Sequence, residues 1–260
     1  MIAPRLGDGE RPLLRLGGIS EVGPTVSWCP PGITGWQPIN AYLITSGDAA
    51  VLVDTGVGAH VDLVLEQLRA SLRPGAHLSV ILTRTEMECC LNLPAIEREF
   101  VVDEVWYTGG ITVPVTRASP RRLQVDSGHP IELVAAPGIT VRVYSPLLRL
   151  LPVLWIGDHA SGALLTSDSF CHLLTDDSGR ALPPDSKGLS AFHSVKFGWI
   201  ADAAATADTQ AIARDVRAIV SDGWTAIGPT YGAPVVGVEQ VLAQADALAD
   251  HIGGVNRYAA

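Results

Sequence analysis

The sequence predicts an α/β protein in which two mixed β-sheets carry helices on their outer faces. Short apolar runs rich in β-branched residues are interleaved with segments whose apolar side chains recur at helical spacing. Of the 260 residues, 47% are apolar and only 17% are charged, so the chain can bury a large core. Strands that pair locally between helices favour this layered arrangement, in a single domain over residues 1–260.

The first predicted elements are a hairpin, a helix and a buried strand. Residues 40–45 and 50–53 are apolar runs, and the Ser-Gly-Asp between them is typical of a turn. From His60 to Leu72 the apolar spacing is that of an amphipathic helix, which Arg-Pro-Gly ends. We expect a buried strand, a second helix and a further strand next, at residues 78–82, 93–100 and 105–107.

Three more strand candidates follow, at residues 140–144, 153–156 and 163–166, and a glycine-bounded turn between the last two indicates antiparallel pairing. Residues 176–188, with two prolines and several charged side chains, predict a long polar loop. The remaining expected elements are a helix, a strand, a glycine-containing loop and a last helix, at residues 211–220, 225–227, 228–232 and 238–251.

The composition indicates which binding partners and which cell compartment to expect. The formal charge of −9 leaves no basic stripe for a nucleic acid or an anionic membrane. The N-terminus lacks the apolar segment of a signal peptide, and no run reaches the ~18 apolar residues of a membrane span. The four cysteines form neither a C-x-x-C pair nor a disulfide scaffold. We therefore expect a soluble cytoplasmic protein.

Several motifs occur in a recognisable order. Asn40-x-Tyr42-Leu43 precedes Val53-Asp54-Thr55-Gly56, and three further segments follow at residues 83–90, 166–170 and 228–232. Together they resemble the metallo-β-lactamase superfamily over about residues 38–240. The resemblance implies a four-layer αββα sandwich of two mixed sheets.

Within that superfamily the sequence is most similar to the oxygen-binding diiron module of flavodiiron proteins. That module has Thr-His-Thr-Glu-x-Asp-His followed by Asn-Leu-Pro-Ala, where residues 83–89 read Thr-Arg-Thr-Glu-Met-Glu-Cys and residues 92–95 read Asn-Leu-Pro-Ala. Residues 145–149, Ser-Pro-Leu-Leu-Arg, are similar to the module's Ala-Pro-Met-Leu-His.

The resemblance also implies that the metal site is altered. It places Arg84 at the first histidine position, Glu86 at the glutamate, Glu88 at the first aspartate, Cys89 at the adjacent histidine, Arg149 at the middle histidine, Asp168 at the bridging aspartate and Tyr231 at the last histidine. A slip of one residue would put Leu150 in place of Arg149. No histidine stands at any of the four histidine positions.

Electrostatics gives this pattern a meaning. Three carboxylates that converge in one cleft need accompanying cations, or they are driven toward protonation. Arg84 and Arg149 could supply two positive charges where the relatives keep two irons, because guanidinium stays charged and binds carboxylates bidentately. Guanidinium cannot ligate a metal ion and repels one. We therefore expect a metal-free salt-bridge network with no cofactor, flavin included.

Three functions stay open, so the sequence does not decide whether the chain is an enzyme. The first is a noncatalytic binding or partner subunit, with a small anionic ligand and a homodimer or another protein as partners. The second is an enzyme in which Arg84, Arg149, Asp168 and His172 bind a small anionic substrate and Glu86, Glu88, Cys89 or Tyr231 performs acid–base or nucleophilic chemistry. The third is a residual metal hydrolase or oxygen-chemistry enzyme, whose all-oxygen ligands would suit Mg²⁺, Ca²⁺ or Mn²⁺.

Simpler readings compete with these roles. Arg84, Glu86 and Glu88 could belong to a solvated charged loop, and Cys89 could be a small buried filler. Asp54 is expected to brace the turn behind the cleft rather than to react. The histidines lack the H-x-H or H-x-x-x-H spacing of ligands, so each is expected to be an ordinary hydrogen-bonding residue, with His172 as the one that could reach the cleft rim.

Overall fold

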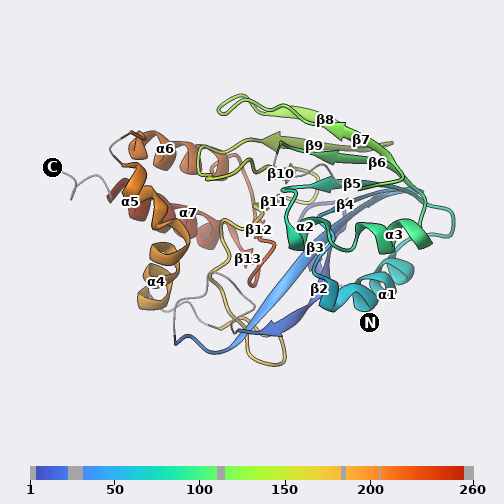
Figure 1. Cartoon of the computed structure of the whole chain (residues 1–260), viewed down its shortest axis with the longest axis horizontal. Coiled ribbons are helices and arrows are strands. Elements are labelled where there is room, and N and C mark those ends of the chain that lie inside the picture. The colour runs from blue at the N-terminus through green and yellow to red at the C-terminus, as the bar shows by residue number, and fades with distance from the viewer. Residues whose placement is uncertain (1–3, 23–31, 110–114, 183–185, 205, 255–260) are drawn as a thin grey trace.

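The computed structural model describes residues 4–22, 32–109, 115–182, 186–204 and 206–254, and within them two mixed β-sheets pack face to face between outer helices (Figure 1). This confirms the predicted fold class. Among the described residues, no helix combines the length and the apolar character that a membrane crossing requires.

The first sheet has the strand order β1 to β7. The strands are β1 (Arg5–Leu6), β2 (Leu13–Glu21), β3 (Trp36–Ser46), β4 (Ala49–Val53), β5 (His77–Leu82), β6 (Val102–Tyr107) and β7 (Ser119–Arg122). Strands β1 to β4 pair antiparallel, which confirms the predicted hairpin, and β4 to β7 pair parallel. The parallel part directs the carboxyl ends of its strands to one edge.

The second sheet runs in the order β8 to β13. Its strands are β8 (Ile131–Ala136), β9 (Ile139–Tyr144), β10 (Trp155–Asp158), β11 (Ala163–Leu165), β12 (Ala226–Gly228) and β13 (Val235–Val236). Neighbouring strands pair antiparallel except β11 and β12, which are parallel. The antiparallel arrangement expected for residues 140–166 is therefore confirmed.

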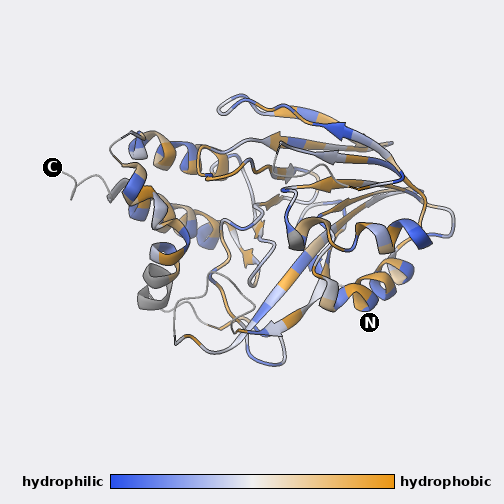
Figure 2. Cartoon of the chain, viewed as in Figure 1, coloured by the Kyte–Doolittle hydropathy of each residue, from blue (hydrophilic) through white to orange (hydrophobic). Residues whose placement is uncertain are grey.

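Helices cover both outer faces. On the side of the first sheet lie the 3₁₀ turn η1 (Gly58–His60) and helices α1 (Val61–Ser71), α2 (Met87–Cys90) and α3 (Leu93–Glu99) (Figure 1). On the side of the second sheet lie α4 (Ser186–Phe197), α5 (Trp199–Ala203), α6 (Thr209–Val220) and α7 (Val238–Gly254). Figure 2 shows hydrophobic and hydrophilic residues mixed along α1, as expected of a helix with one buried face.

Alternation along the strands produces the four layers. On β3, Tyr42 and Ile44 are buried in the core between the two sheets, whereas Ala41 and Leu43 are buried against α1 and α3. Successive side chains of a strand point to opposite faces, so one apolar strand serves two cores. Burying each such large side chain stabilises the fold by about 1.5 to 3 kcal/mol.

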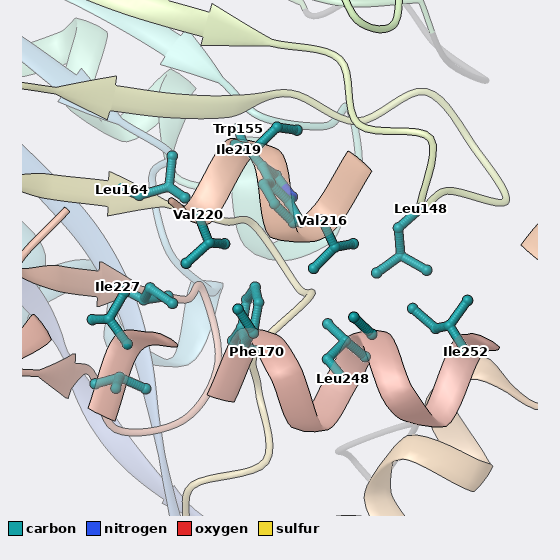
Figure 3. Packing of buried hydrophobic residues seen from close by; sticks show 14 of the residues in the cluster. Leu148, Trp155, Leu164, Phe170, Val216, Ile219, Val220, Ile227, Leu248 and Ile252 are labelled. Carbon is teal, nitrogen blue, oxygen red and sulfur yellow. The ribbon is translucent and has the colours of Figure 1, made fainter. Parts of the chain in front are cut away.

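A third core joins the second sheet to α6 and α7 (Figure 3). It contains Leu148 and Phe170, which lie one residue before Arg149 and two residues after Asp168. Both loops that carry these charged residues are thus anchored by a buried apolar neighbour.

Several regions differ from the predictions, which also did not include strands β1, β2, β8 and β13. The polar loop expected over residues 176–188 ends in α4, and no helix was expected over residues 189–203. The segment begins Ser-Lys-Gly-Leu-Ser, a weak helix former, so its packing against α7 is what favours the helix. Pro183 and Pro184 lie outside the described residues. The exposed edge strand β7, Ser-Pro-Arg-Arg, was also not expected, because it carries no apolar pattern.

Candidate functional site

A pocket of about 230 Å³ opens where the loops after β5, β9 and β11 meet α4 and α5. Its lining combines charged and apolar side chains: Arg84, Glu86, Leu148, Arg149, Leu150, Leu151, Val153, Asp168, Ser169, Lys196, Phe197 and Trp199. The loops after β5 and β11 both leave the carboxyl ends of strands, which is where open α/β sheets place their ligand sites.

Arg84 stands among three carboxylates. Its Nη1 lies 2.8 Å from Asp168 Oδ2 and 3.2 Å from Glu86 Oε2, and its Nη2 donates a hydrogen bond to Glu88. The Arg84 side chain is only 9% exposed and that of Glu88 only 3%. The expected meeting of Arg84 with these carboxylates is therefore observed, and the solvated-loop reading is wrong for Arg84 and Glu88.

Charge balance explains why this arginine is tolerated in a buried place. Burial works against the charged guanidinium, yet the neighbouring carboxylates of Asp168 and Glu86 hold the pKa of Arg84 above its ordinary value. Glu88 lies on α2 and Arg84 lies in the bend before that helix, and their two side chains meet in a buried ion pair.

Lys196 supplies the second cation. Its Nζ, on the last turn of α4, forms an ion pair with Asp168, and the two side chains are 14% and 13% exposed. Burial raises the pKa of the Asp168 carboxyl, but the charges of Arg84 and Lys196 outweigh that effect and hold it below the usual range. Sequence reasoning missed Lys196, because its segment carried neither a family motif nor an expected helix.

Arg149 lies in the same pocket but has a different partner. Its Nη1 donates to Ser145 Oγ, four residues earlier on the same loop. Leu150, which is 72% exposed, also lines the pocket, so the loop offers both residues to it. Within the described chain, the second cation beside Asp168 is thus Lys196 rather than Arg149.

Behind the pocket, Asp54 joins the ends of three strands. Its buried carboxylate accepts hydrogen bonds from Thr83 N at 2.8 Å and from Thr230 Oγ1 at 3.0 Å. Asp54 has a φ of 58° and Ser167 a φ of 51°, a left-handed conformation that costs non-glycine residues energy. Burial raises the pKa of Asp54 to about 6, although the hydrogen bonds to the carboxylate lower it. The geometry agrees with the bracing role expected for Asp54.

Three other candidate residues are buried. Burial raises the pKa of the Cys89 thiol well above its ordinary value, so a neutral thiol is favoured there. Burial also raises the pKa of Tyr231, which packs with Ile39 and Cys171. His172 contacts His193 of α4, with the ring centroids 5.5 Å apart. The chemical roles assigned to these residues stay predictions.

The donor set does not fit the diiron centre that the fold family implies. Asp168 is already paired with two fixed cations, and guanidinium and ammonium groups oppose a divalent ion at the same oxygens. Across the part of the chain that the structure describes, no group of three or more His, Cys, Asp or Glu side chains is arranged to hold a metal ion.

Comparisons with known proteins agree with the expected resemblance. The sequence model of the metallo-β-lactamase superfamily matches residues 34–83. A search of curated protein sequences gives no match.

Solved structures resemble nearly the whole chain. Rubredoxin oxygen:oxidoreductase from Desulfovibrio gigas has 15% identity and a TM-score of 0.67, covering 96% of this chain and 61% of its own. A fragment of diflavin flavoprotein A 5 from Nostoc has 16% identity and a TM-score of 0.62, covering 98% and 97%. The apo chemotaxis sensor ODP from T. denticola has 14% identity and a TM-score of 0.64, covering 94% and 91%.

This chain therefore spans about three fifths of the length of the D. gigas protein. Metallo-β-lactamases also match, at lower TM-scores. At these identities the likeness establishes the fold. The chain has the metallo-β-lactamase fold and resembles the flavodiiron proteins that share it.

Proposed function

We propose that this chain is a flavodiiron-like protein whose cleft works without a metal, and that it acts as a binding or partner subunit for a small anionic ligand rather than as an enzyme. The observation that carries the proposal is the Arg84 guanidinium, which lies within ion-pair distance of Glu86, Glu88 and Asp168. Lys196 adds a second fixed cation.

Coulomb energies show how far the cations oppose a divalent ion. At about 4 Å and an effective dielectric constant near 20, two unit charges interact by about 4 kcal/mol, so Arg84 repels a divalent ion by roughly 8 kcal/mol and offsets the attraction of one carboxylate at the same distance. A metal at Asp168 would have to displace two cations that the carboxylate already binds. Imidazole, the ligand that iron and zinc favour, is missing from the motif positions.

The buried candidates do not favour catalysis. Cys89 is held as a thiol, and burial also keeps the Tyr231 hydroxyl protonated, so neither is ready to act as a nucleophile or base at neutral pH. A chemotaxis sensor with this fold, matched over 91% of its chain, supports a sensing or binding role for the fold, and that sensor is also described as a peroxy diiron species, so it does not bear on metal loss.

Metal titration tests the proposal. The purified protein is titrated calorimetrically with Fe²⁺ and Zn²⁺, and its melting temperature is compared with and without chelator. We expect no tight binding and an unchanged melting temperature. Arg84→Ala, which uncovers the carboxylates, should bind divalent ions more tightly than the wild type, while Arg69→Ala, an exposed arginine, should not. Tight binding by the wild type would contradict the proposal.

An enzymatic alternative rests on Glu86. Its side chain is 33% exposed and lines the pocket beside Arg149, so it can reach a bound anion as a base. If this alternative holds, Glu86→Gln should abolish turnover of a carboxylate substrate while leaving its binding intact. NMR of small carboxylates incubated with the protein separates binding, seen as line broadening, from turnover, seen as new signals. The metal titration tests the third candidate, a residual metal hydrolase or oxygen-chemistry enzyme.

The partner role has its own test. Sedimentation of the purified chain measures whether it forms a homodimer. A monomer at all concentrations would limit the partner role to other proteins, whereas a concentration-dependent dimer would support self-association.

A further inference from the structure

Three histidines gather where α4 meets α7, outside the described pocket. His193 of α4 lies between His172, which follows the site loop, and His251 of α7, with ring centroids 5.5 and 5.4 Å apart. One turn further along α4, Lys196 and Phe197 line the Arg84 pocket. The same helix therefore joins the histidine cluster to the pocket wall.

His172 and His193 are buried and His251 is half-buried, and among the described residues none of the three rings forms an ion pair. His193 is 3% exposed and His172 is 7% exposed, and no described atom forms a hydrogen bond with His193 Nε2. Burial, and after it the two neighbouring imidazoles, lowers the pKa of His193. Burial alone lowers the pKa of His251, and at His172 the neutral carboxamide of Gln244 partly opposes the lowering of the pKa by burial.

Three charged side chains of α4 and α7 pair with residues outside the cluster. On α4, Lys196 is directed to Asp168, and on α7, Asp246 and Asp250 pair with Arg217 of α6. A proton on His193 would therefore place a positive charge in an apolar environment, beside two other titratable rings and Phe197, which is unfavourable.

We infer that His172, His193 and His251 form an acid-sensitive contact that docks α4 against α7, and that mild acid releases α4 and opens the Arg84 pocket. The inference concerns regulation of the pocket and rests on the binding function proposed above. Release would take the Lys196 cation away from Asp168 and leave that carboxylate facing the open pocket.

Proton linkage gives the direction in which docking of α4 changes with pH. Burial lowers the pKa of His172 to about 4, and burial together with the other two imidazoles lowers that of His193 to about 3. Burial also lowers the pKa of His251. When α4 leaves α7 and the cluster becomes exposed, the three rings titrate near their ordinary value of about 6.5. Below that pH the released form binds protons that the docked form excludes, so docking weakens as the pH falls.

The expected change in the equilibrium between docked and released α4 is large. Between pH 7.5 and 5.0, His172 and His193 each shift the equilibrium toward release by about 30-fold, or about 10³-fold together. The Asp168 carboxylate does not titrate in this range, because its pKa lies below its usual value. The pH response is therefore assigned to the histidines.

Hydrogen exchange of the full chain, corrected for the intrinsic pH dependence of amide exchange, tests the inference. Between pH 7.5 and 5.0, protection of residues 192–203 should fall by about 10³-fold, while that of α1 should not change in parallel. His193→Phe should reduce the change to about 30-fold, and His172→Gln should do the same if the first variant fails to fold. His129→Gln, at an exposed histidine, should behave as the wild type.

Equal protection of residues 192–203 at both pH values would overturn the inference, as would an undiminished change in both cluster variants. Failure of the metal-free function is measured separately, by metal content at pH 7.5. A protein that carried iron but retained the exchange pattern would refute the proposed function without affecting this contact.

Discussion

Replacing Arg84 with methionine removes the charge that holds three carboxylates together. Glu88, 3% exposed, and Asp168, 13% exposed, would stay buried with one cation fewer. Removing one partner of a buried pair costs about 3 to 5 kcal/mol, because the remaining charge is left uncompensated. We expect a loss of that size for Arg84→Met at neutral pH, or roughly 6 to 20 °C in melting temperature.

Urea denaturation at pH 7.5 and 5.5 measures the loss. Arg69→Met is the matched control, since Arg69 also binds a glutamate, Glu99, but its side chain is 54% exposed. An exposed pair contributes at most about 1 kcal/mol. The cost of Arg84→Met should shrink at pH 5.5, because carboxylates without their cation have raised pKa values and take up protons there. A cost no larger than that of Arg69→Met, at both pH values, would refute the buried network.

Three further expectations concern the same region. Lys196→Met should cost roughly 1 to 2 kcal/mol in urea denaturation, less than Arg84→Met, since Arg84 still holds Asp168 and Lys196 pairs with one carboxylate rather than three. A larger cost than that of Arg84→Met would contradict this ranking. Cys89 should react with iodoacetamide far more slowly than the half-buried Cys90, as peptide mass spectrometry can measure, because burial holds it as a thiol. Folding raises the pKa of Asp54 from 3.8 to about 6, so the folded protein gains stability as the pH falls through 6. Between pH 7.5 and 5.0 the free energy of unfolding of the wild type should rise by about 1.4 kcal/mol relative to that of Asp54→Asn. A difference between the two proteins that does not change with pH would refute the raised pKa.

Local pattern was sufficient for the elements around the cleft. The run at residues 50–53 and the helix after His60 have clear strand and helix periods, and these elements appear as β4 and α1. Arg84 and Asp168 could be placed together because the resemblance aligns both with ligand loops of the metallo-β-lactamase superfamily. In the structure each of them follows the carboxyl end of a strand, β5 and β11, at the cleft.

Tertiary packing decided the rest. Helix α4 forms in a segment with weak helical propensity and packs against α7, so neither the helix nor Lys196 at its end had a local signal. The histidine cluster was missed for a related reason: His172, His193 and His251 come from three elements far apart in the chain, and no short spacing connects them.

Elemental analysis of the protein tests the central claim most directly. The chain is expressed with iron and zinc supplied, purified without chelator, dialysed, and measured for transition metals. Because Arg84 and Lys196 already occupy the carboxylates, we expect far less than one equivalent of iron or zinc per chain. Two equivalents of either metal that survive dialysis would contradict the account and would mean that the cleft binds metal through a ligand set other than the one assigned above.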